Sequence, residues 1–184
     1  MGRDTCDAVG DGMRIAYADP PYVGQSKKHY GKEETYAGEV DHAELIAILC
    51  ADYPDGWALS CSSPSLRLLL PLCPDDVRVG AWVKPFAAFK VNVNPGYCWE
   101  PVIFRGGRKQ RSRDEDTVRD WVSANITLRR GLSGVKPDAF CFWLFDLMGM
   151  RPGDDLVDLF PGSKAVTKAW TRYVTQLWQI GRTA

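Results

Sequence analysis

The stretch Asp19-Pro20-Pro21-Tyr22 combines a carboxylate, two rigid prolines and an aromatic ring directly after the apolar residues 15–18. The apolar residues predict a short buried strand, which two consecutive prolines end because they lack N–H donors and fix φ. The strand would hold the carboxylate of Asp19 and the carbonyl of Pro20 at its end, where α/β sheets keep their ligands. Two acceptors at that place could bind both N–H groups of a flat amine, while Tyr22 stacks on its ring.

These groups suit alkylation of the exocyclic amino nitrogen of a nucleobase. The lone pair of that nitrogen is delocalised into the ring, so the nitrogen is a poor nucleophile. Two hydrogen-bond acceptors would pull it toward tetrahedral geometry and free the lone pair. Taken alone, four such residues more often mark a strand that ends in a polyproline turn with a tyrosine on the surface. A second motif is needed to decide between the two interpretations.

The second motif lies near the other end of the chain, in residues 154–166. A run of Leu, Val, Leu and Phe with interspersed acids is followed there by Pro161-Gly162-Ser163 and a helix-compatible segment, which predicts a strand, a tight turn and a helix. Gly162 would let a ligand approach the backbone, and the start of the helix would offer free N–H groups. A plain β–α turn is the alternative for this segment taken alone.

Together the two motifs resemble the DNA amino-methyltransferases, which use S-adenosylmethionine to methylate adenine N6 or cytosine N4. Asp-Pro-Pro-Tyr comes first here, and the segment that resembles the FxGxG cofactor loop comes last, which is the permuted order of the family's beta group. Residues 134–137 and 140–147 look like the KP element and its helix, which line the methionine end of the cofactor in relatives. Residues 82–85 and 99–104 resemble the hairpin strands that flank the target-base pocket.

The resemblance implies a single domain over residues 1–184, with a Rossmann-like methyltransferase sheet flanked by helices and without the far edge strands. It implies methyl transfer from S-adenosylmethionine to adenine N6 in DNA, since relatives with Asp at the first motif position mostly act on adenine. So short a version resembles a reduced, phage-like enzyme. The implied catalytic residues are Asp19, Pro20, Pro21 and Tyr22. The implied cofactor-binding residues are Lys136, Pro137, Asp158, Phe160, Gly162 and Ser163.

Two departures from the family pattern concern the cofactor. Lys164 replaces the usual second glycine, so its ammonium would stand beside a positive sulfonium unless the side chain extends into solvent. Relatives also continue into a strand that ends in an acid for the cofactor ribose. Residues 165–180 predict one helix instead, because apolar residues recur at three- and four-residue spacing. The cofactor would then be held in another way or weakly, or a partner subunit or homodimer would complete the pocket.

Other functions stay open at this point. A methyltransferase-like chain that has lost cofactor binding would be a non-catalytic nucleic-acid-binding protein. An enzyme could also act on cytosine N4, an RNA base or a protein amide. Amide-methylating relatives usually carry Asn in place of Asp19 and have the cofactor loop first, so the order found here argues against that acceptor.

Two basic segments could contact the phosphates of DNA. In the loop after Asp-Pro-Pro-Tyr, the candidate nucleic-acid contacts are Lys27, Lys28, Tyr30 and Lys32. In the run after the strand at 99–104, the candidate contacts are Arg105, Arg108, Lys109 and Arg111. The alternatives are a solvated loop for the first segment and, for the second, internal neutralisation by the acids at 114–116. Residues 111–133 are the candidate for a small target-recognition insert.

Composition agrees with a compact enzyme. The 184 residues are 45% apolar and carry a formal net charge of zero, so DNA binding would depend on local patches rather than on a global field. The six cysteines show no CxxC spacing, which favours buried reduced thiols over zinc or disulfides, and no metal site is predicted. No apolar run of about twenty residues and no signal peptide is found, which predicts a cytoplasmic protein of a bacterial or phage-infected cell.

Three further elements are predicted from local patterns. Residues 41–50 predict a helix with Asp41 as its N-cap. Residues 57–61 predict a strand, and residues 65–72 predict a helix that ends before Pro74.

Overall fold

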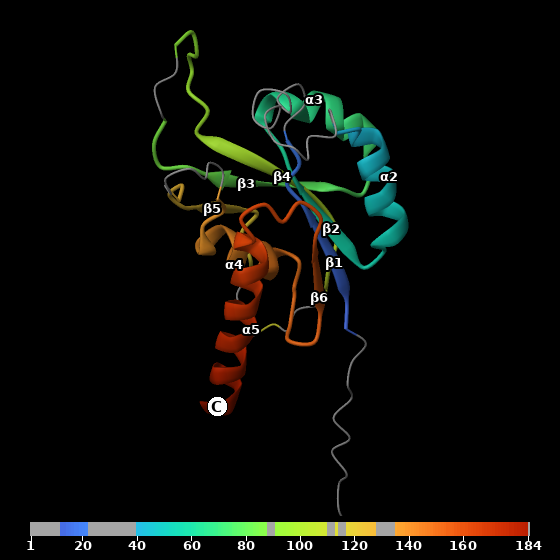
Figure 1. The fold of residues 1–184 in the computed structure, drawn as a ribbon, viewed down its shortest axis with the longest axis vertical. Coiled ribbons are helices and arrows are strands. Elements are labelled where there is room, and N and C mark those ends of the chain that lie inside the picture. The colour runs from blue at the N-terminus through green and yellow to red at the C-terminus, as the bar shows by residue number, and fades with distance from the viewer. Residues whose placement is uncertain are drawn as a thin grey trace, which may run out of the picture.

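The computed structural model describes residues 12–21, 40–87, 91–109, 113, 117–127 and 135–183. Six strands form one mixed sheet in the order β5-β3-β4-β2-β1-β6 (Figure 1). The strands are β1 (Arg14–Ala18), β2 (Gly56–Ser60), β3 (Arg78–Val83), β4 (Trp99–Gly106), β5 (Trp121–Ser123) and β6 (Asp155–Asp158). β1 lies parallel to both β2 and β6, whereas β4 is antiparallel to its neighbours β2 and β3. The carboxyl ends of β1, β2 and β6 therefore meet at one edge of the sheet.

Helices cover both faces of the sheet (Figure 1). The helices are α2 (His42–Asp52), α3 (Leu66–Leu69), α4 (Asp138–Leu147) and α5 (Ala165–Thr183), and short 3₁₀ turns span Ser63–Ser65 and Leu70–Leu72. α2 and α3 pack on one face, and α4 and α5 pack on the other. The predicted α/β architecture is therefore confirmed.

Strand β1 supplies apolar side chains to both faces, as a central strand must. Ile15 and Tyr17 point into the cluster beneath α4 and α5, and Ala16 and Ala18 point into the cluster beneath α2. All four are buried. A strand that is buried on both faces cannot shift its register without exposing one set, so its carboxyl end is held in place.

The predicted helices at 41–50 and 165–180 are confirmed. The Asp41 carboxylate accepts hydrogen bonds from the N–H groups of Ala43 and Glu44 at 2.9 and 3.0 Å, which caps α2. Helix α5 buries Val166, Ala169 and Tyr173 against α4, and the spacing of these residues matches one helical face.

One local prediction differs from the structure, and one strand was not predicted. The segment 65–72 is one α-helical turn between 3₁₀ turns rather than a single helix, because Pro71 has no N–H to continue the α pattern. The strand β5 was not predicted, and it lies inside the candidate recognition insert, where it pairs with β3.

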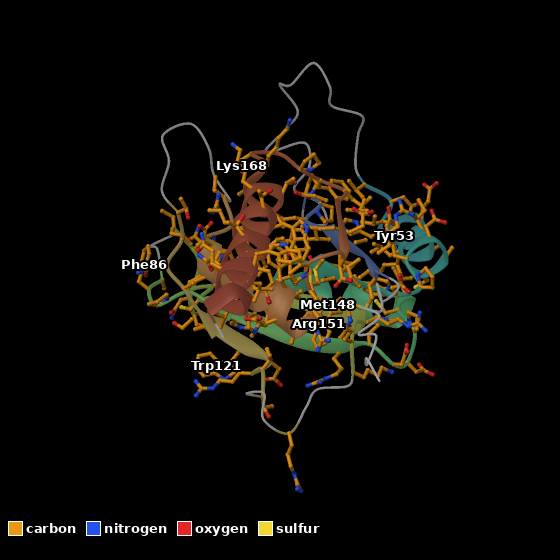
Figure 2. The ribbon with its side chains drawn as sticks, turned by 90° about the horizontal axis from the view of Figure 1, so that it is seen from below. Tyr53, Phe86, Trp121, Met148, Arg151 and Lys168 are labelled. Carbon is orange, nitrogen blue, oxygen red and sulfur yellow. The ribbon has the colours of Figure 1, made fainter. Side chains whose placement is uncertain are left out.

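In Figure 2, Trp121 of this strand and Phe86 lie on one flank of the molecule and Tyr53 lies on the opposite flank. Within the described part of the chain, no helix is both long and apolar enough to span a bilayer.

Candidate active site

Two carboxylates meet at the carboxyl edge of the sheet. Asp19 follows β1 directly, and Asp158 is the last residue of the neighbouring strand β6. Tyr17 is paired with Asp158 in the register of these strands, and the Leu159 N–H donates to the Tyr17 carbonyl at 2.9 Å. The two sequence motifs, separated by most of the chain, are therefore adjacent in space.

The Asp19 carboxylate belongs to a chain of alternating charges. Lys136 Nζ donates to Asp19 Oδ1 at 3.0 Å and to Glu100 Oε1 at 2.5 Å. Lys84 Nζ donates to Glu100 Oε2 at 3.0 Å. Glu100 and Lys136 are only 4% and 6% exposed, whereas the side chain of Asp19 is 25% exposed. The chain thus runs from a buried centre to one carboxylate that reaches the surface.

Aromatic rings and a helix start hold Lys136 in this position. Its ammonium lies 5.5 Å from the ring centroid of Trp82 and 5.7 Å from that of Phe140. Pro137 is the N-cap residue of α4, so the lysine stands directly before the helix that buries Phe140. A buried ammonium requires compensating charge, and both carboxylates supply it.

The charges in this chain shift one another's pKa. Burial raises the pKa of Asp19, and the nearby Glu100 raises it further, while Lys136 opposes both. Burial alone would raise the pKa of Glu100, but Lys136 and Lys84 together lower it below its usual value. For Lys136 the two carboxylates outweigh burial and raise the pKa. Lys136 and Glu100 are therefore both charged near neutral pH.

Asp158 offers an acceptor that no described protein group uses. The Thr167 hydroxyl donates to Asp158 Oδ2 at 3.2 Å. Asp158 Oδ1 is buried and has no hydrogen-bond partner among the described residues. Burial raises the pKa of this carboxyl group. Buried polar atoms are nearly always satisfied, so this atom suits a ligand that donates a hydrogen bond.

The turn after β6 leaves open space beside the backbone. Gly162 has φ 39°, and a Cβ added there would meet no atom nearer than the Phe160 carbonyl oxygen at 3.9 Å. Packing therefore does not require a glycine at this position, but the positive φ favours glycine. The missing side chain also lets a ligand approach the backbone closely. Lys164 has φ 56°, where glycine is also preferred, and its side chain is exposed. The lysine thus extends into solvent.

A hollow of about 260 Å³ joins the KP element to the start of α5. Lys136, Pro137 and Ser163 line it, together with Lys168 and Arg172 of α5. The structure therefore brings three of the predicted cofactor residues to one cavity. Phe160 instead packs against the cluster beneath α2.

The predicted nucleic-acid residues are placed as follows. Arg105, Arg108 and Lys109 lie at the far end of β4, opposite the start of β2 and away from Asp19. The side chains that fall outside the described residues are Tyr22, Lys27, Lys28, Tyr30, Lys32 and Arg111. The predicted phosphate contacts of both segments stay predictions.

Sequence reasoning missed Glu100 and Lys84 as site residues. One signal was present, because Val-Lys-Pro occurs twice, at 83–85 and 135–137, and both lysines bind the same carboxylate. A glutamate inside the apolar run 99–104 was the second signal, since a buried acid needs a partner.

The described residues hold no group of three or more His, Cys, Asp or Glu placed to bind a metal ion. Of the six cysteines, the five that the structure describes are free thiols, and burial raises the pKa of Cys61 and of Cys141 to about 12.

Comparison with known proteins identifies the fold. No protein-family model and no curated protein matches the chain. A crystal structure of M1.HpyAVI in complex with SAM is similar, with a TM-score of 0.60 and 16% identity over 88% of this chain and 78% of that chain. A second structure of M1.HpyAVI gives a TM-score of 0.54 and 14% identity over 88% and 76%. The predicted Rossmann-like methyltransferase fold is thus confirmed.

Proposed function

We propose that the protein transfers a methyl group from S-adenosylmethionine to the N6 amine of adenine in DNA. The observation that carries this proposal is the position of Asp19, which lies partly exposed at the carboxyl edge of the sheet, next to the strand that ends in Asp158. Two structures of M1.HpyAVI, one of them in complex with SAM, have a similar fold and support the cofactor.

Asp19 would be the acceptor for the target amine. Lys136 occupies Oδ1, which leaves Oδ2 of a partly exposed carboxylate for an incoming N–H group. The Pro20 carbonyl would accept the second N–H, as the motif predicts. Lys136 touches the reacting carboxylate and keeps it oriented, and Glu100 acts through Lys136 as a positioning residue. A fixed acceptor aimed at developing positive charge on the nitrogen would favour the transition state.

The cofactor site fits a cationic ligand with a hydrogen-bond donor. The cluster of Asp19, Glu100, Asp158, Lys84 and Lys136 carries a net charge of −1 when all five are ionised, and the adjoining hollow adds Lys168 and Arg172, the latter paired with Asp138. S-adenosylmethionine carries a sulfonium and an ammonium, and it supplies the electrophilic methyl group when bound. Asp158 Oδ1 would accept from the ammonium, and the bare backbone at Gly162 would admit the ligand. Ser163 and Pro137 would line its methionine end.

Calorimetry with S-adenosylmethionine tests the cofactor first. The wild type is expected to bind, and Asp158→Asn should weaken binding by about ten- to a hundredfold, the cost of losing a charged acceptor. Thr167→Val is the matched control, because it removes the hydroxyl that donates to Asp158 Oδ2 and leaves the unpartnered Oδ1 in place. Failure of the wild type to bind at millimolar concentration would leave a non-catalytic nucleic-acid-binding protein.

A methyl-transfer assay then tests the acceptor. Duplexes that contain either adenine or cytosine as the methylatable base, with a matched RNA, separate the three nucleobase acceptors. Asp19→Ala should lower turnover at least about a hundredfold while cofactor affinity changes little. Near-normal turnover in Asp19→Ala would exclude the proposed role of this residue.

A further inference from the structure

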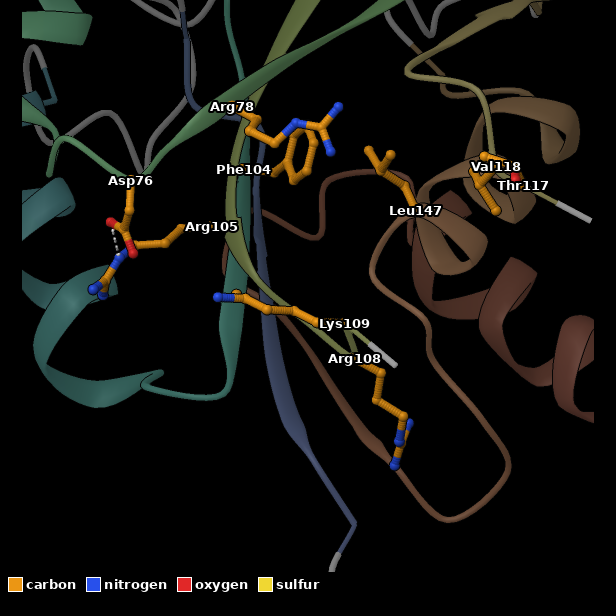
Figure 3. A pocket seen from close by; sticks show the side chains of 10 residues that line it. Asp76, Arg78, Phe104, Arg105, Arg108, Lys109, Thr117, Val118 and Leu147 are labelled. Atoms are coloured by element: carbon orange, nitrogen blue, oxygen red, sulfur yellow. Dashed lines mark hydrogen bonds and ion pairs between the residues drawn. The ribbon is translucent and has the colours of Figure 1, made fainter. Parts of the chain in front are cut away.

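Figure 3 shows the residues that line a second hollow. This hollow has a volume of about 440 Å³ and lies at the opposite end of the sheet from Asp19. Phe104, Val118 and Leu147 form an apolar wall, and the basic residues Arg78, Arg105 and Lys109 line the rest. From Trp99, at the catalytic edge, to Arg105 the strand β4 covers roughly 20 Å at about 3.3 Å per residue. This hollow is therefore separate from the proposed active site.

Not every cation here is available to a ligand. Arg108 borders the hollow, but its guanidinium points away in Figure 3 and binds both carboxylate oxygens of Asp154. Arg105 Nε donates to Asp76 Oδ1 at 2.6 Å, which neutralises the one acid in the lining. Arg108 is thus structural, and Arg105 is partly engaged.

Two cations stay largely uncompensated. Arg78 reaches Asp120 only at 3.9 Å, and the two side chains are 68% and 59% exposed, so that pair is worth little. Lys109 has no hydrogen bond or ion pair to another described residue. Its charge contributes, after that of Arg105, to lowering the pKa of Asp76. Among the described residues, the hollow therefore has an excess of positive charge with one acid in its lining.

Arg78 is also held in place before any ligand arrives. Its guanidinium lies 5.5 Å from the ring centroid of the buried Phe104, which Figure 3 shows directly beneath it. A planar guanidinium fixed on a ring presents its N–H fork outward, the geometry that suits two oxygens of one phosphate. Lys109 supplies a point charge, and the Thr117 hydroxyl lines the same cavity.

We infer that this hollow binds a phosphate group of a nucleotide, either in a nucleic-acid strand or as a free mononucleotide. Its apolar wall would cover the sugar or base, and Arg78 and Lys109 would hold the phosphate. A strand has one phosphate per about 3.4 Å, so a strand that also engages Asp19 must extend about six nucleotides beyond the target. The strand form deepens the proposed function, whereas the mononucleotide form is independent of it.

Duplex length separates these cases. Binding of labelled duplexes of ~8 and ~30 base pairs, each with one central adenine, is measured for the wild type, Arg78→Gln and Lys109→Gln. Each substitution should weaken binding of the long duplex several-fold and make its salt slope shallower by about one, and leave the short duplex unchanged. Arg67→Gln is the control, since Arg67 is exposed on α3 and lies outside the hollow.

The second arm is calorimetry with adenosine monophosphate and with inorganic phosphate. Binding that both substitutions abolish would assign the site to a free nucleotide, and a loss confined to long DNA would assign it to the strand backbone. An unchanged long-duplex affinity together with no nucleotide binding overturns the inference, as does an equal loss in Arg67→Gln. Methylation of the short duplex reports the proposed catalysis separately, so failure of one proposal does not imply failure of the other.

Discussion

Glu100 lies at the buried centre of the chain of alternating charges in the site. It is buried, and each of its oxygens binds a different lysine, one of which binds Asp19. Removal of its charge would leave Lys136 with Asp19 as its carboxylate partner and would take from Lys84 its ion pair with Glu100. The residue therefore affects both the folded state and the protonation of Asp19, the proposed catalytic carboxylate.

We predict that Glu100→Gln shifts the pH dependence of methyl transfer. Glu100 raises the pKa of Asp19, so its neutralisation should lower that pKa and move the acidic limb of the rate profile to lower pH. The substitution should also destabilise the fold by about 3 kcal/mol, because it breaks a buried ion network. The limb is measured well below the unfolding temperature.

Glu100→Asp retains the charge and should keep the limb near its wild-type pH. Glu44→Gln, on the exposed first turn of α2, serves as the charge control. A reduced rate with an unmoved limb would assign Glu100 a structural role alone.

At the scale of elements, the turn between β6 and α5 carries local strain at Lys164. Its φ of 56° lies in the left-handed region, which costs an L-residue about 1–2 kcal/mol. Lys164→Gly removes that cost, while the greater freedom of glycine in the unfolded chain takes back about 0.5–1 kcal/mol. We therefore predict a small gain in unfolding free energy, measured by urea titration.

Lys168→Gly is the matched control, four residues later in the interior of α5. A helical glycine should cost about 1 kcal/mol there, so the two substitutions are expected to have opposite signs. The exposed Lys164 side chain also implies that Lys164→Gly hardly changes cofactor affinity. Destabilisation of equal size in both variants would contradict the left-handed conformation.

The end of β4 is joined to the loop before β6 by Arg108 and Asp154. The buried Asp154 carboxylate binds the Arg108 guanidinium with both oxygens and accepts the N–H groups of Met13 and Arg151 at 2.8 and 2.7 Å. We predict that Arg108→Gln lowers the unfolding free energy by about 2–3 kcal/mol, because it leaves a buried carboxylate without its cation. Lys109→Gln, one residue later, should change stability by less than about 0.5 kcal/mol.

The pH dependence of that difference has a definite sign. Arg108 and the backbone N–H groups hold the pKa of Asp154 below its usual value against the effect of burial. Such a group stabilises the fold fully above its unfolded pKa of about 3.9, and this contribution disappears as pH falls through the lower folded pKa. The gap between the wild type and Arg108→Gln should therefore be constant near neutral pH and narrow below about pH 4. A gap that does not change down to pH 3 would exclude the ion pair as its source.

At the scale of the molecule, sequence reasoning found what is local and missed what depends on long-range register. Each of the two motifs was predicted to follow a short strand, and the resemblance put both in one site; the structure shows that the two strands are parallel neighbours that end at one edge. The pairing of Glu100 with Lys136 did not follow, because it depends on the antiparallel strand β4 and on a segment 36 residues away. β5 has three residues, too few to show any periodicity. The fixed ends of strands were predictable, and the partners of a buried charge were not.

The two faces of the sheet are predicted to unfold as one cooperative unit. β1 and β2 bury alternate side chains in both clusters, so neither cluster can open without exposing strands that the other needs.

Leu49→Ala, which truncates a fully buried side chain of α2, should lower the unfolding free energy by about 2–5 kcal/mol. Hydrogen exchange measured on peptides from α2 and α4 should then show the same loss of protection, although Leu49 is in the cluster on the opposite face from α4. Ile48→Ala, at an exposed position of the same helix, should leave both peptides unchanged. A loss of protection confined to α2 would mean that the two faces are separate units, and the single-domain prediction for residues 1–184 would then be wrong.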